Sequence, residues 1–189
     1  MLKSLDLHRE LRLGLDALGH TQATEVQQAV VPLALSGADL QVSAETGSGK
    51  TLAYLLPMAQ ALLESGADRH PGTRGLVLVP TRELARQVLK HCRALLAKSH
   101  LQAQAITGGA DFKYQKSLLR KDPEILIATP GRLLEHCQKG SADLASLKVL
   151  VLDEADRMLD MGFRDDVSAI IGHCATDKQV IMLSATLGH

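Results

Sequence analysis

The sequence predicts an α/β fold in which a mostly parallel β-sheet carries helices on both faces. Short apolar runs alternate along the chain with longer amphipathic segments, which is the pattern that repeated strand–helix–strand units produce. The runs at residues 76–79, 125–128 and 149–152 are apolar throughout, as expected of strands that helices cover on both faces. A chain of 189 residues with 46% hydrophobic content can bury one good core, so we expect a single domain.

The individual elements follow from the same patterns. Helical periodicity predicts helices over residues 5–18, 25–35, 50–64, 82–98 and 163–174. The apolar runs predict strands over residues 40–44, 75–80, 125–129, 149–153 and 180–184, and the alternating residues 102–107 predict an edge or half-exposed strand. Residues 65–72 predict an exposed loop. Ligands of such sheets bind beyond the carboxyl ends of the strands, so the polar motifs that follow these runs are the candidate sites.

Composition narrows the possible partners. The 21 basic and 21 acidic residues balance, so any contact with a nucleic acid must come from local donors and helix ends rather than from a global field. Aromatic residues make up only 2% of the chain, which argues against a stacking platform for bases. There is no run of about 20 apolar residues and no basic leader followed by an apolar core. We therefore expect a soluble, cytoplasmic protein that does not contact a membrane.

Three cysteines each follow a histidine, which raises the possibility of a zinc site. The pairs are His91-Cys92, His136-Cys137 and His173-Cys174. Their spacings match no usual zinc pattern, and each cysteine completes an apolar helical stripe, with its histidine expected near a helix C-terminus. An odd number of distant cysteines also argues against a disulfide framework. We expect neither structural zinc nor disulfides.

Residues 44–51, with the sequence Ala-Glu-Thr-Gly-Ser-Gly-Lys-Thr, lie between a predicted strand and a predicted helix. Such a loop directs successive backbone N–H groups at one point, at the positive end of a helix, where a phosphate chain binds. Lys50 would reach the outer phosphates, and the hydroxyl of Thr51 would complete the coordination of Mg²⁺. The alternative is a flexible turn, and Ala44 replaces the usual first glycine. The residues expected to bind nucleotide are Ala44, Thr46, Gly47, Ser48, Gly49, Lys50 and Thr51.

An acidic pair, Asp153 and Glu154, follows the apolar run 149–152. Downstream of a phosphate loop, such a pair predicts that Asp153 binds the magnesium ion and that Glu154 orients or deprotonates the water that attacks the γ-phosphate. Together with Lys50, these are the candidate catalytic residues. The alternative is a charged helix N-terminus, where carboxylates are favoured without any catalytic role.

Residues 151–163 resemble the signature of the DEAD-box ATP-dependent RNA helicases, whose name spells residues 153–156. Six further elements stand in the family's order: residues 19–27, the phosphate loop, and residues 80–85, 108–109, 129–132 and 184–186. The resemblance covers almost the whole chain and is closest to bacterial members. It implies a RecA-like P-loop NTPase fold, ATP and Mg²⁺ as cofactors, RNA as partner, and ATP hydrolysis coupled to local unwinding of RNA duplexes.

In this resemblance, residues 19–27 are the Q motif, in which Thr24 and Gln27 bind the adenine. A carboxamide can pair with the N6 and N7 edge of adenine through one donor and one acceptor, which guanine cannot match. The motif departs from the family at His20, where an aromatic residue is common, and at Ala23, where proline is usual. Leu2 occupies roughly the place of the aromatic that packs over the adenine. We expect base choice to be retained and adenine affinity to be weaker.

The resemblance also implies residues that contact RNA and residues that couple the two sites. Helix starts after the runs 75–79 and 125–128, with Thr81 and Thr129 as N-caps and Pro130 at the first helical position, would each present free N–H groups and one arginine to a phosphate. Such contacts carry no sequence information. The residues expected to bind the RNA backbone are Thr81, Arg82, Gly108, Gly109, Thr129 and Arg132, and those expected to couple the sites are Asp156, Ser184 and Thr186.

The resemblance implies one RecA-like domain over residues 1–189, in which a Q-motif region at 1–36 leads into a core at 37–189. A second RecA-like domain, which these residues do not include, would supply the arginines that complete the ATP site, so slow hydrolysis is expected without it. Two alternatives stay open. An ATP-gated RNA clamp would carry the same motifs, and a P-loop enzyme unrelated to RNA would show no RNA-stimulated hydrolysis.

Overall fold

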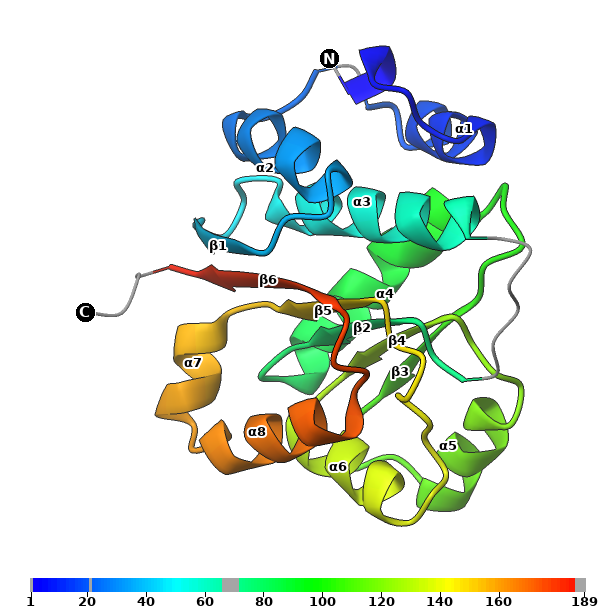
Figure 1. The fold of residues 1–189 in the computed structure, drawn as a ribbon, viewed down its shortest axis with the longest axis vertical. Helices are drawn as coiled ribbons and strands as arrows, with labels where there is room; N and C mark the ends of the chain where they lie inside the picture. The colour runs from blue at the N-terminus through cyan, green and yellow to red at the C-terminus, as the bar shows by residue number, and fades with distance from the viewer. Residues whose placement is uncertain (1, 21, 66–71, 186–189) are drawn as a thin grey trace.

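Six parallel strands form one sheet at the centre of the protein, in the order β1-β6-β5-β2-β4-β3 (Figure 1). The computed structural model describes residues 2–20, 22–65 and 72–185. The strands are β1 (Leu40–Ser43), β2 (Gly75–Leu78), β3 (Ala103–Ile106), β4 (Ile125–Ala128), β5 (Val149–Leu152) and β6 (Gln179–Ser184). This arrangement confirms the predicted α/β class and places each predicted strand within one or two residues.

Eight α-helices and one short 3₁₀-helix connect the strands within the described ranges. They are the 3₁₀-helix η1 (Leu2–Ser4) and α1 (Arg9–Ala17), α2 (Glu25–Leu35), α3 (Lys50–Glu64), α4 (Arg82–Leu96), α5 (Phe112–Leu119), α6 (Pro130–Gln138), α7 (Ala155–Asp160) and α8 (Arg164–His173). The prediction for residues 5–18 is too long at its start, because His8 is the N-cap of α1 and accepts a hydrogen bond from Glu10 N. The short helices α5 and α7 were not predicted. None of the helices within these ranges is both long enough and apolar enough to cross a membrane.

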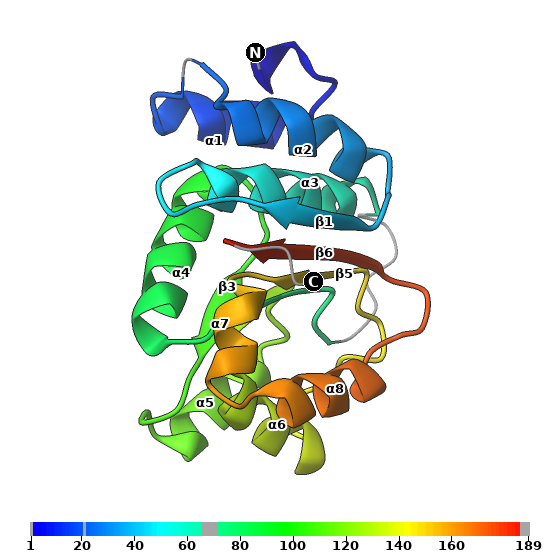
Figure 2. The same cartoon turned by 90° about the vertical axis from the view of Figure 1, so that its left-hand side faces the viewer.

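The helices cover both faces of the sheet, and the N-terminal region adds a further layer. Helices α3 and α4 pack on one face and α5 to α8 on the other, each over its own buried cluster of side chains. Figure 2 shows α1 and α2 stacked outside α3, where α2 packs along α3 and α1 packs against α4. The sequence predicted helices on both faces of the sheet, which is three layers, and α1 and α2 form a fourth layer on that core.

Burial along the strands agrees with their positions in the sheet. The central strands β2, β4 and β5 are buried at every residue, as their uninterrupted apolar runs predicted. Strand β3 lies at one edge and is only partly buried, which confirms the prediction from its alternating pattern. Strand β1 forms the other edge, and β6 separates it from β5. The phosphate loop after β1 and the acidic pair after β5 therefore lie at the same end of the sheet, two strands apart.

Candidate functional site

The phosphate loop ends at the N-terminus of α3, in the arrangement that the sequence predicted. Gly47 and Gly49 have φ angles of 84° and 83°, a left-handed backbone that glycine adopts without strain. Lys50 is the first residue of α3 and Gly49 is its N-cap. A Cβ on Gly49 would lie 2.7 Å from Gln27 Nε2 and 2.8 Å from Thr24 Oγ1, so only glycine fits there. Backbone N–H groups at the positive end of a helix form an anion-binding geometry.

The carboxylate of Asp153, the first residue of the acidic pair, contacts Lys50 at the end of the phosphate loop. Its side chain is fully buried, and Lys50 Nζ lies 3.0 Å from Asp153 Oδ1. The hydroxyl of Tyr54, also fully buried, donates to Asp153 Oδ2 at 2.9 Å. Burial first, and the charge of Asp153 second, raise the pKa of Tyr54 well above its usual 10.0, so the hydroxyl keeps its proton. Apart from the ion pair with Lys50, Oδ1 makes no hydrogen bond within the described part of the chain, which suits a metal ligand or its water.

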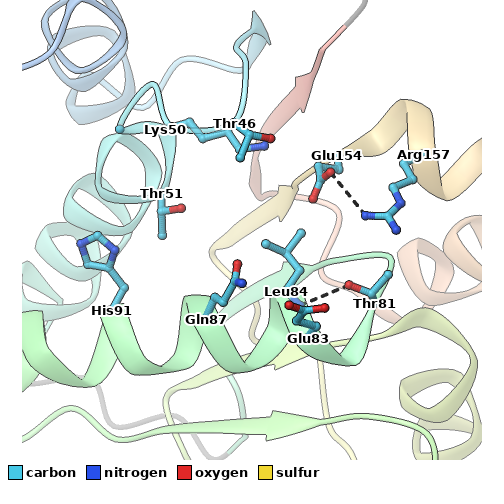
Figure 3. A pocket seen from close by; sticks show the side chains of 12 residues that line it. Thr46, Lys50, Thr51, Thr81, Glu83, Leu84, Gln87, His91, Glu154 and Arg157 are labelled. Carbon is cyan, nitrogen blue, oxygen red and sulfur yellow. Dashed lines mark hydrogen bonds and ion pairs between the residues drawn. The ribbon is translucent and has the colours of Figure 1, made fainter.

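A cavity of about 510 Å³ lies between the phosphate loop, one face of α4 and the end of β5 (Figure 3). Lys50, Thr51 and Glu154 all line it, so the structure brings these predicted residues together. Glu154 has a φ of 53°, which is rare for a residue with a side chain and typical of strained functional positions. Its carboxylate lies 3.7 Å from the guanidinium of Arg157, which lines the same cavity.

The Q motif packs directly against the phosphate loop. Gln27 is buried, and its Nε2 donates to the carbonyl of Gly49 at 3.1 Å. Its Oε1 accepts from Thr24 N and from the ring nitrogen Nε2 of His20, each at 3.0 Å. Because the Thr24 hydroxyl also accepts from Gln27 N, the two residues form a capping box at the start of α2. Gln27 Oε1, which the resemblance assigns to adenine, therefore already has two donors in the structure.

The first group of residues predicted to contact RNA lies together at the ends of β2 and β3. Thr81 is the N-cap of α4 and its hydroxyl accepts from Leu84 N at 3.2 Å, which confirms the predicted cap. Arg82 Nη1 lies 3.5 Å from the carbonyl oxygen of Gly108. Gly109 has a φ of 84°, and a Cβ there would overlap the Arg82 guanidinium. The absence of that Cβ makes room for Arg82, whereas a Cβ on Gly108 would meet open space.

Thr129 differs from the prediction in one respect. It occupies the N-cap position of α6, with Pro130 as the first helical residue, but its hydroxyl does not cap the helix. The hydroxyl instead accepts from Gly108 N at 3.4 Å. The reason is that β3 and β4 are neighbours, so the residues following them meet. Thr129 thus ties the end of β4 to the glycine pair after β3.

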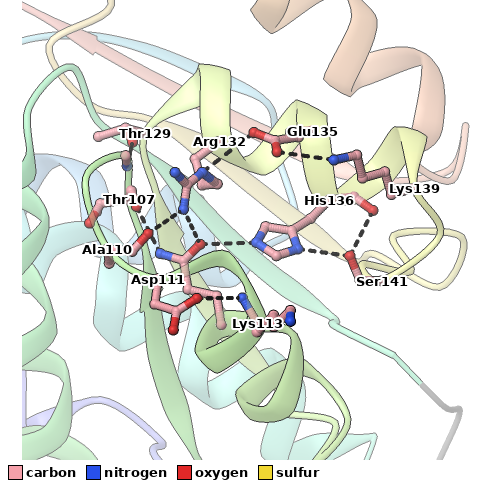
Figure 4. Close-up of polar contacts among 12 residues, drawn as sticks. Thr107, Ala110, Asp111, Lys113, Thr129, Arg132, Glu135, His136, Lys139 and Ser141 are labelled. Atoms are coloured by element: carbon pink, nitrogen blue, oxygen red, sulfur yellow. Dashed lines mark hydrogen bonds and ion pairs between the residues drawn. The ribbon is translucent and has the colours of Figure 1, made fainter.

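Arg132 is held in a network of polar contacts between α5 and α6 (Figure 4). Its Nη1 donates to the carbonyl of Ala110 at 2.7 Å and to Gln115 Oε1 at 3.0 Å. His136 Nε2 shares the same Gln115 oxygen at 2.9 Å, and Gln115 Nε2 donates to the carbonyl of Thr107 at 2.7 Å. The amide of Gln115 therefore connects Arg132 to the strand end that leads into the glycine pair.

Two of the three histidines lie near helix C-termini, as predicted. His91 does not, because α4 continues past it to Leu96. His136 lies in the last turn of α6 but is fully buried, stacked on the ring of Phe112 with centroids 4.0 Å apart. Burial first, and the nearby Arg132 second, lower the pKa of His136 from 6.5, so it does not supply the positive charge expected at the helix end. His173 ends α8. His91 lines the large cavity, and burial followed by the charge of His20 lowers its pKa.

The three cysteines are unpaired thiols in the structure. Cys92 and Cys137 are buried, and burial raises the pKa of each thiol to about 12. Across residues 2–20, 22–65 and 72–185, no three or more His, Cys, Asp or Glu side chains gather in an arrangement that could hold a metal ion.

The residues predicted to couple the two sites follow β5 and β6. Ser184 ends β6, and its carbonyl accepts from Ala44 N at 3.0 Å, so Ala44 extends the sheet ladder. Asp156 lies in the first turn of α7, where its Oδ1 accepts from Arg157 N at 3.0 Å. Thr186 lies outside the described residues.

The sequence pattern of the DEAD/DEAH box helicases matches residues 24–189, which is most of the chain. The chain belongs to the DEAD/DEAH box helicase family. Its parallel sheet with helices on both faces is the RecA-like fold expected of that family, and the acidic pair at the end of β5 belongs to the family's name-giving motif.

Relatives in this helicase family are much longer than the chain. ATP-dependent RNA helicase SrmB of Escherichia coli (strain K12) is 43% identical over 183 residues, which are 97% of this chain and 41% of that protein. ATP-dependent RNA helicase DbpA of Bacillus subtilis (strain 168) is 40% identical over 98% of this chain and 38% of its own length. Probable ATP-dependent RNA helicase ddx27 of Dictyostelium discoideum is 44% identical over 98% of this chain and 24% of its own length. The chain thus spans between a quarter and two fifths of these relatives.

Several residues of this DEAD-box domain that contact the predicted site were not singled out from the sequence. Tyr54 follows Lys50 by one helical turn, and that spacing could have placed both on one face of α3. Arg157 follows Glu154 by three residues, which is also a helical contact distance. Gln87 lies on the face of α4 that lines the cavity, one turn before His91, which the sequence singled out only for its pairing with Cys92. Gln115 carried no recognisable signal, because its partners come from two other segments, the residue Thr107 after β3 and the helix α6.

Proposed function

We propose that the chain is the ATP-binding RecA-like domain of an ATP-dependent RNA helicase, with a Q-motif region at residues 1–36 and a core at 37–189. The observation that carries this proposal is the meeting of Lys50, Asp153 and Glu154 at one end of the sheet, where Lys50 and Glu154 line one cavity and Lys50 Nζ lies 3.0 Å from the buried carboxylate of Asp153. Membership of the DEAD/DEAH box helicase family supports it.

The residues of the cavity fit ATP with Mg²⁺. The loop amides from Thr46 to Thr51 and the ammonium of Lys50 would bind the phosphates, and the adenine would lie against Thr24 and Gln27. Thr51 and Asp153 would hold the metal. The Oδ1 atom of Asp153 is buried and, apart from its ion pair with Lys50, makes no hydrogen bond in the described part of the chain. A bound Mg²⁺ neutralises charge on the outer phosphates.

Glu154 is the proposed general base for the attacking water. Its carboxylate reaches the cavity because the left-handed backbone turns the chain sharply after β5. The guanidinium of Arg157 lies 3.7 Å from this carboxylate and would hold it at the cavity. The pair would thus hold Glu154 ready to orient the water and take up its proton.

The second set of residues fits the sugar–phosphate backbone of RNA. The helix starts at Thr81 and Thr129, the guanidinium groups of Arg82 and Arg132, and the glycine pair at 108–109 follow three adjacent strands. Contacts of these kinds position a backbone and do not read bases, so binding is expected to tolerate different sequences. We propose that Asp156, Ser184 and Thr186 couple this surface to the ATP site.

The complete protein is expected to contain more than this domain, since the relatives are two to four times longer. We propose that a second RecA-like domain closes over ATP and RNA and supplies arginines worth about 10³ to 10⁵ in rate, so the domain alone would hydrolyse ATP very slowly. Buried free thiols fit a reducing compartment, and we propose the cytoplasm.

The decisive experiment is ATP turnover by the complete protein with and without RNA. RNA should stimulate turnover, Lys50→Ala should abolish nucleotide binding, and Glu154→Gln should keep binding but lose hydrolysis. Because Lys50 is the charged partner of a buried carboxylate, the thermal unfolding of Lys50→Ala must be measured beside its binding. Turnover by Glu154→Gln within about threefold of the unaltered protein would refute the general-base role.

A strand-release assay on a short RNA duplex then separates the helicase from the ATP-gated clamp. A helicase releases the strand in the presence of ATP. A clamp binds the RNA in an ATP-dependent manner yet leaves the duplex intact, and a P-loop enzyme unrelated to RNA shows no effect of RNA on turnover.

A further inference from the structure

We propose that Tyr54 is a positioning residue for the metal site, whose hydroxyl fixes the carboxylate of Asp153 so that the second oxygen faces the phosphate loop. This inference rests on the proposed function, because it assigns a role within the same ATP site. The structure shows one residue on α3 for each oxygen of the carboxylate: Lys50 Nζ lies 3.0 Å from Oδ1, and Tyr54 donates to Oδ2 at 2.9 Å.

The position of Tyr54 follows from helix geometry. It lies four residues after Lys50, so both side chains project from the same face of α3 toward β5. The ring and hydroxyl are fully buried in the core between α3 and the sheet. Packing alone would be satisfied by phenylalanine, which lacks only the hydroxyl. A buried hydroxyl requires a partner, and the partner here is the carboxylate of Asp153.

The two partners of Asp153 differ in what nucleotide binding demands of them. Lys50 must turn its ammonium toward the phosphates, which removes the positive charge from Oδ1. Tyr54 does not line the cavity, so its hydroxyl can keep its hydrogen bond to Asp153 throughout. The Tyr54 hydroxyl, 2.9 Å from Oδ2, therefore keeps the orientation of the Asp153 carboxylate while Oδ1 becomes free for the metal or its water.

The test compares Tyr54→Phe with Tyr114→Phe in the complete protein. The chain has only two tyrosines, and Tyr114 is 61% exposed on α5, so the control makes the same chemical change far from the site. Binding of a fluorescent, non-hydrolysable ATP analogue is titrated at a series of free Mg²⁺ concentrations and in EDTA. Hydrogen-bond partners of metal ligands typically contribute 10-fold to 100-fold in metal affinity, so we expect the half-saturating Mg²⁺ concentration to rise at least about 10-fold in Tyr54→Phe.

Each outcome decides a separate point. A half-saturating concentration within about threefold of the unaltered protein overturns the proposal, even if the thermal unfolding midpoint of Tyr54→Phe falls, because that result means that the hydroxyl only stabilises the fold. An equal rise in Tyr114→Phe also overturns it. If the unaltered protein binds the analogue with no dependence on Mg²⁺, the proposed ATP–Mg²⁺ site itself is wrong, and the inference falls with it.

Discussion

Replacing Gln115 by leucine should weaken both the fold and the RNA surface, because this side chain has three partners. Gln115 is only 2% exposed and contacts Arg132, His136 and the carbonyl of Thr107. Arg132 can only donate, so the shared atom of Gln115 is its carbonyl oxygen, and the His136 nitrogen on that oxygen must carry a hydrogen. Leucine has a similar volume but leaves each of these groups without its partner.

The size of the effect follows from the groups that lose their partners. The N–H of His136 loses a buried hydrogen bond, which costs about 1–3 kcal/mol, and the carbonyl of Thr107 loses a partly buried one, which costs less. The free energy of unfolding should therefore fall by about 2 kcal/mol. For a domain of this size, that change lowers the unfolding midpoint by about 4 °C or more. Arg132 keeps the carbonyl of Ala110 but loses one contact that fixes its direction, so RNA affinity should fall several-fold.

The assay pairs denaturant unfolding with fluorescence anisotropy on a single-stranded RNA in the presence of a non-hydrolysable ATP analogue. Gln138→Leu is the matched control, because Gln138 is exposed at the end of α6. The control should change stability by less than about 0.5 kcal/mol. Nucleotide affinity should be the same in both variants, since Gln115 does not line the large cavity. The reasoning is wrong if Gln115→Leu unfolds like the control, or if it unfolds more easily but binds RNA unchanged.

Two further predictions concern stability. In α1, a Cβ on Gly14 would overlap a backbone carbonyl of α4, so Gly14→Ala should lose about 1–3 kcal/mol on denaturant unfolding. Gly172 in α8 has open space around it, so Gly172→Ala should gain about 0.5–1 kcal/mol, and equal effects of the two changes would contradict the packing described for α1. The pKa of buried His136 is lowered from 6.5, so the unfolded chain takes up a proton first as the pH falls through 6.5, and stability should decline below that pH. The unfolding midpoint measured between about pH 8 and about pH 5 should fall less steeply in His136→Phe, and an unchanged slope would refute this cause.

The sequence was sufficient to predict the strands of the sheet, because parallel strands buried on both faces leave short runs that are apolar throughout. Even the edge position of β3 was predictable from its alternating residues 102–107. Both boundaries of α2 and of α3 were also predicted correctly. In the structure, α2 begins after Thr24 and α3 begins at the end of the phosphate loop. The short helices α5 and α7 were missed because eight or six residues give too few turns for a periodic signal.

Contacts between segments were harder to predict than elements. Periodicity indicates that Tyr54 is buried but not that its hydroxyl meets a carboxylate 99 residues later. The hydroxyl of Thr129 was expected to cap its own helix, yet a neighbouring loop offered Gly108 N as a donor. His20 could be recognised as a departure from the family, but its hydrogen bond to Gln27 depends on how the chain folds back on the loop. Such pairings depend on tertiary structure, which one-dimensional patterns do not record.

The position of β6 between β1 and β5 has a mechanical consequence. Strands β1 and β5 do not pair with each other; each forms its ladder with β6, with Leu40 aligned to Ile181 and Leu152 to Met182. The phosphate loop and the acidic pair are therefore held at a separation of two strand widths, about 9–10 Å, by a third strand that contributes to neither. A lateral displacement of β6 would therefore move β1 and β5 relative to each other. Because β6 ends at Ser184, a pull on the backbone at that point would act on both halves of the nucleotide site at once.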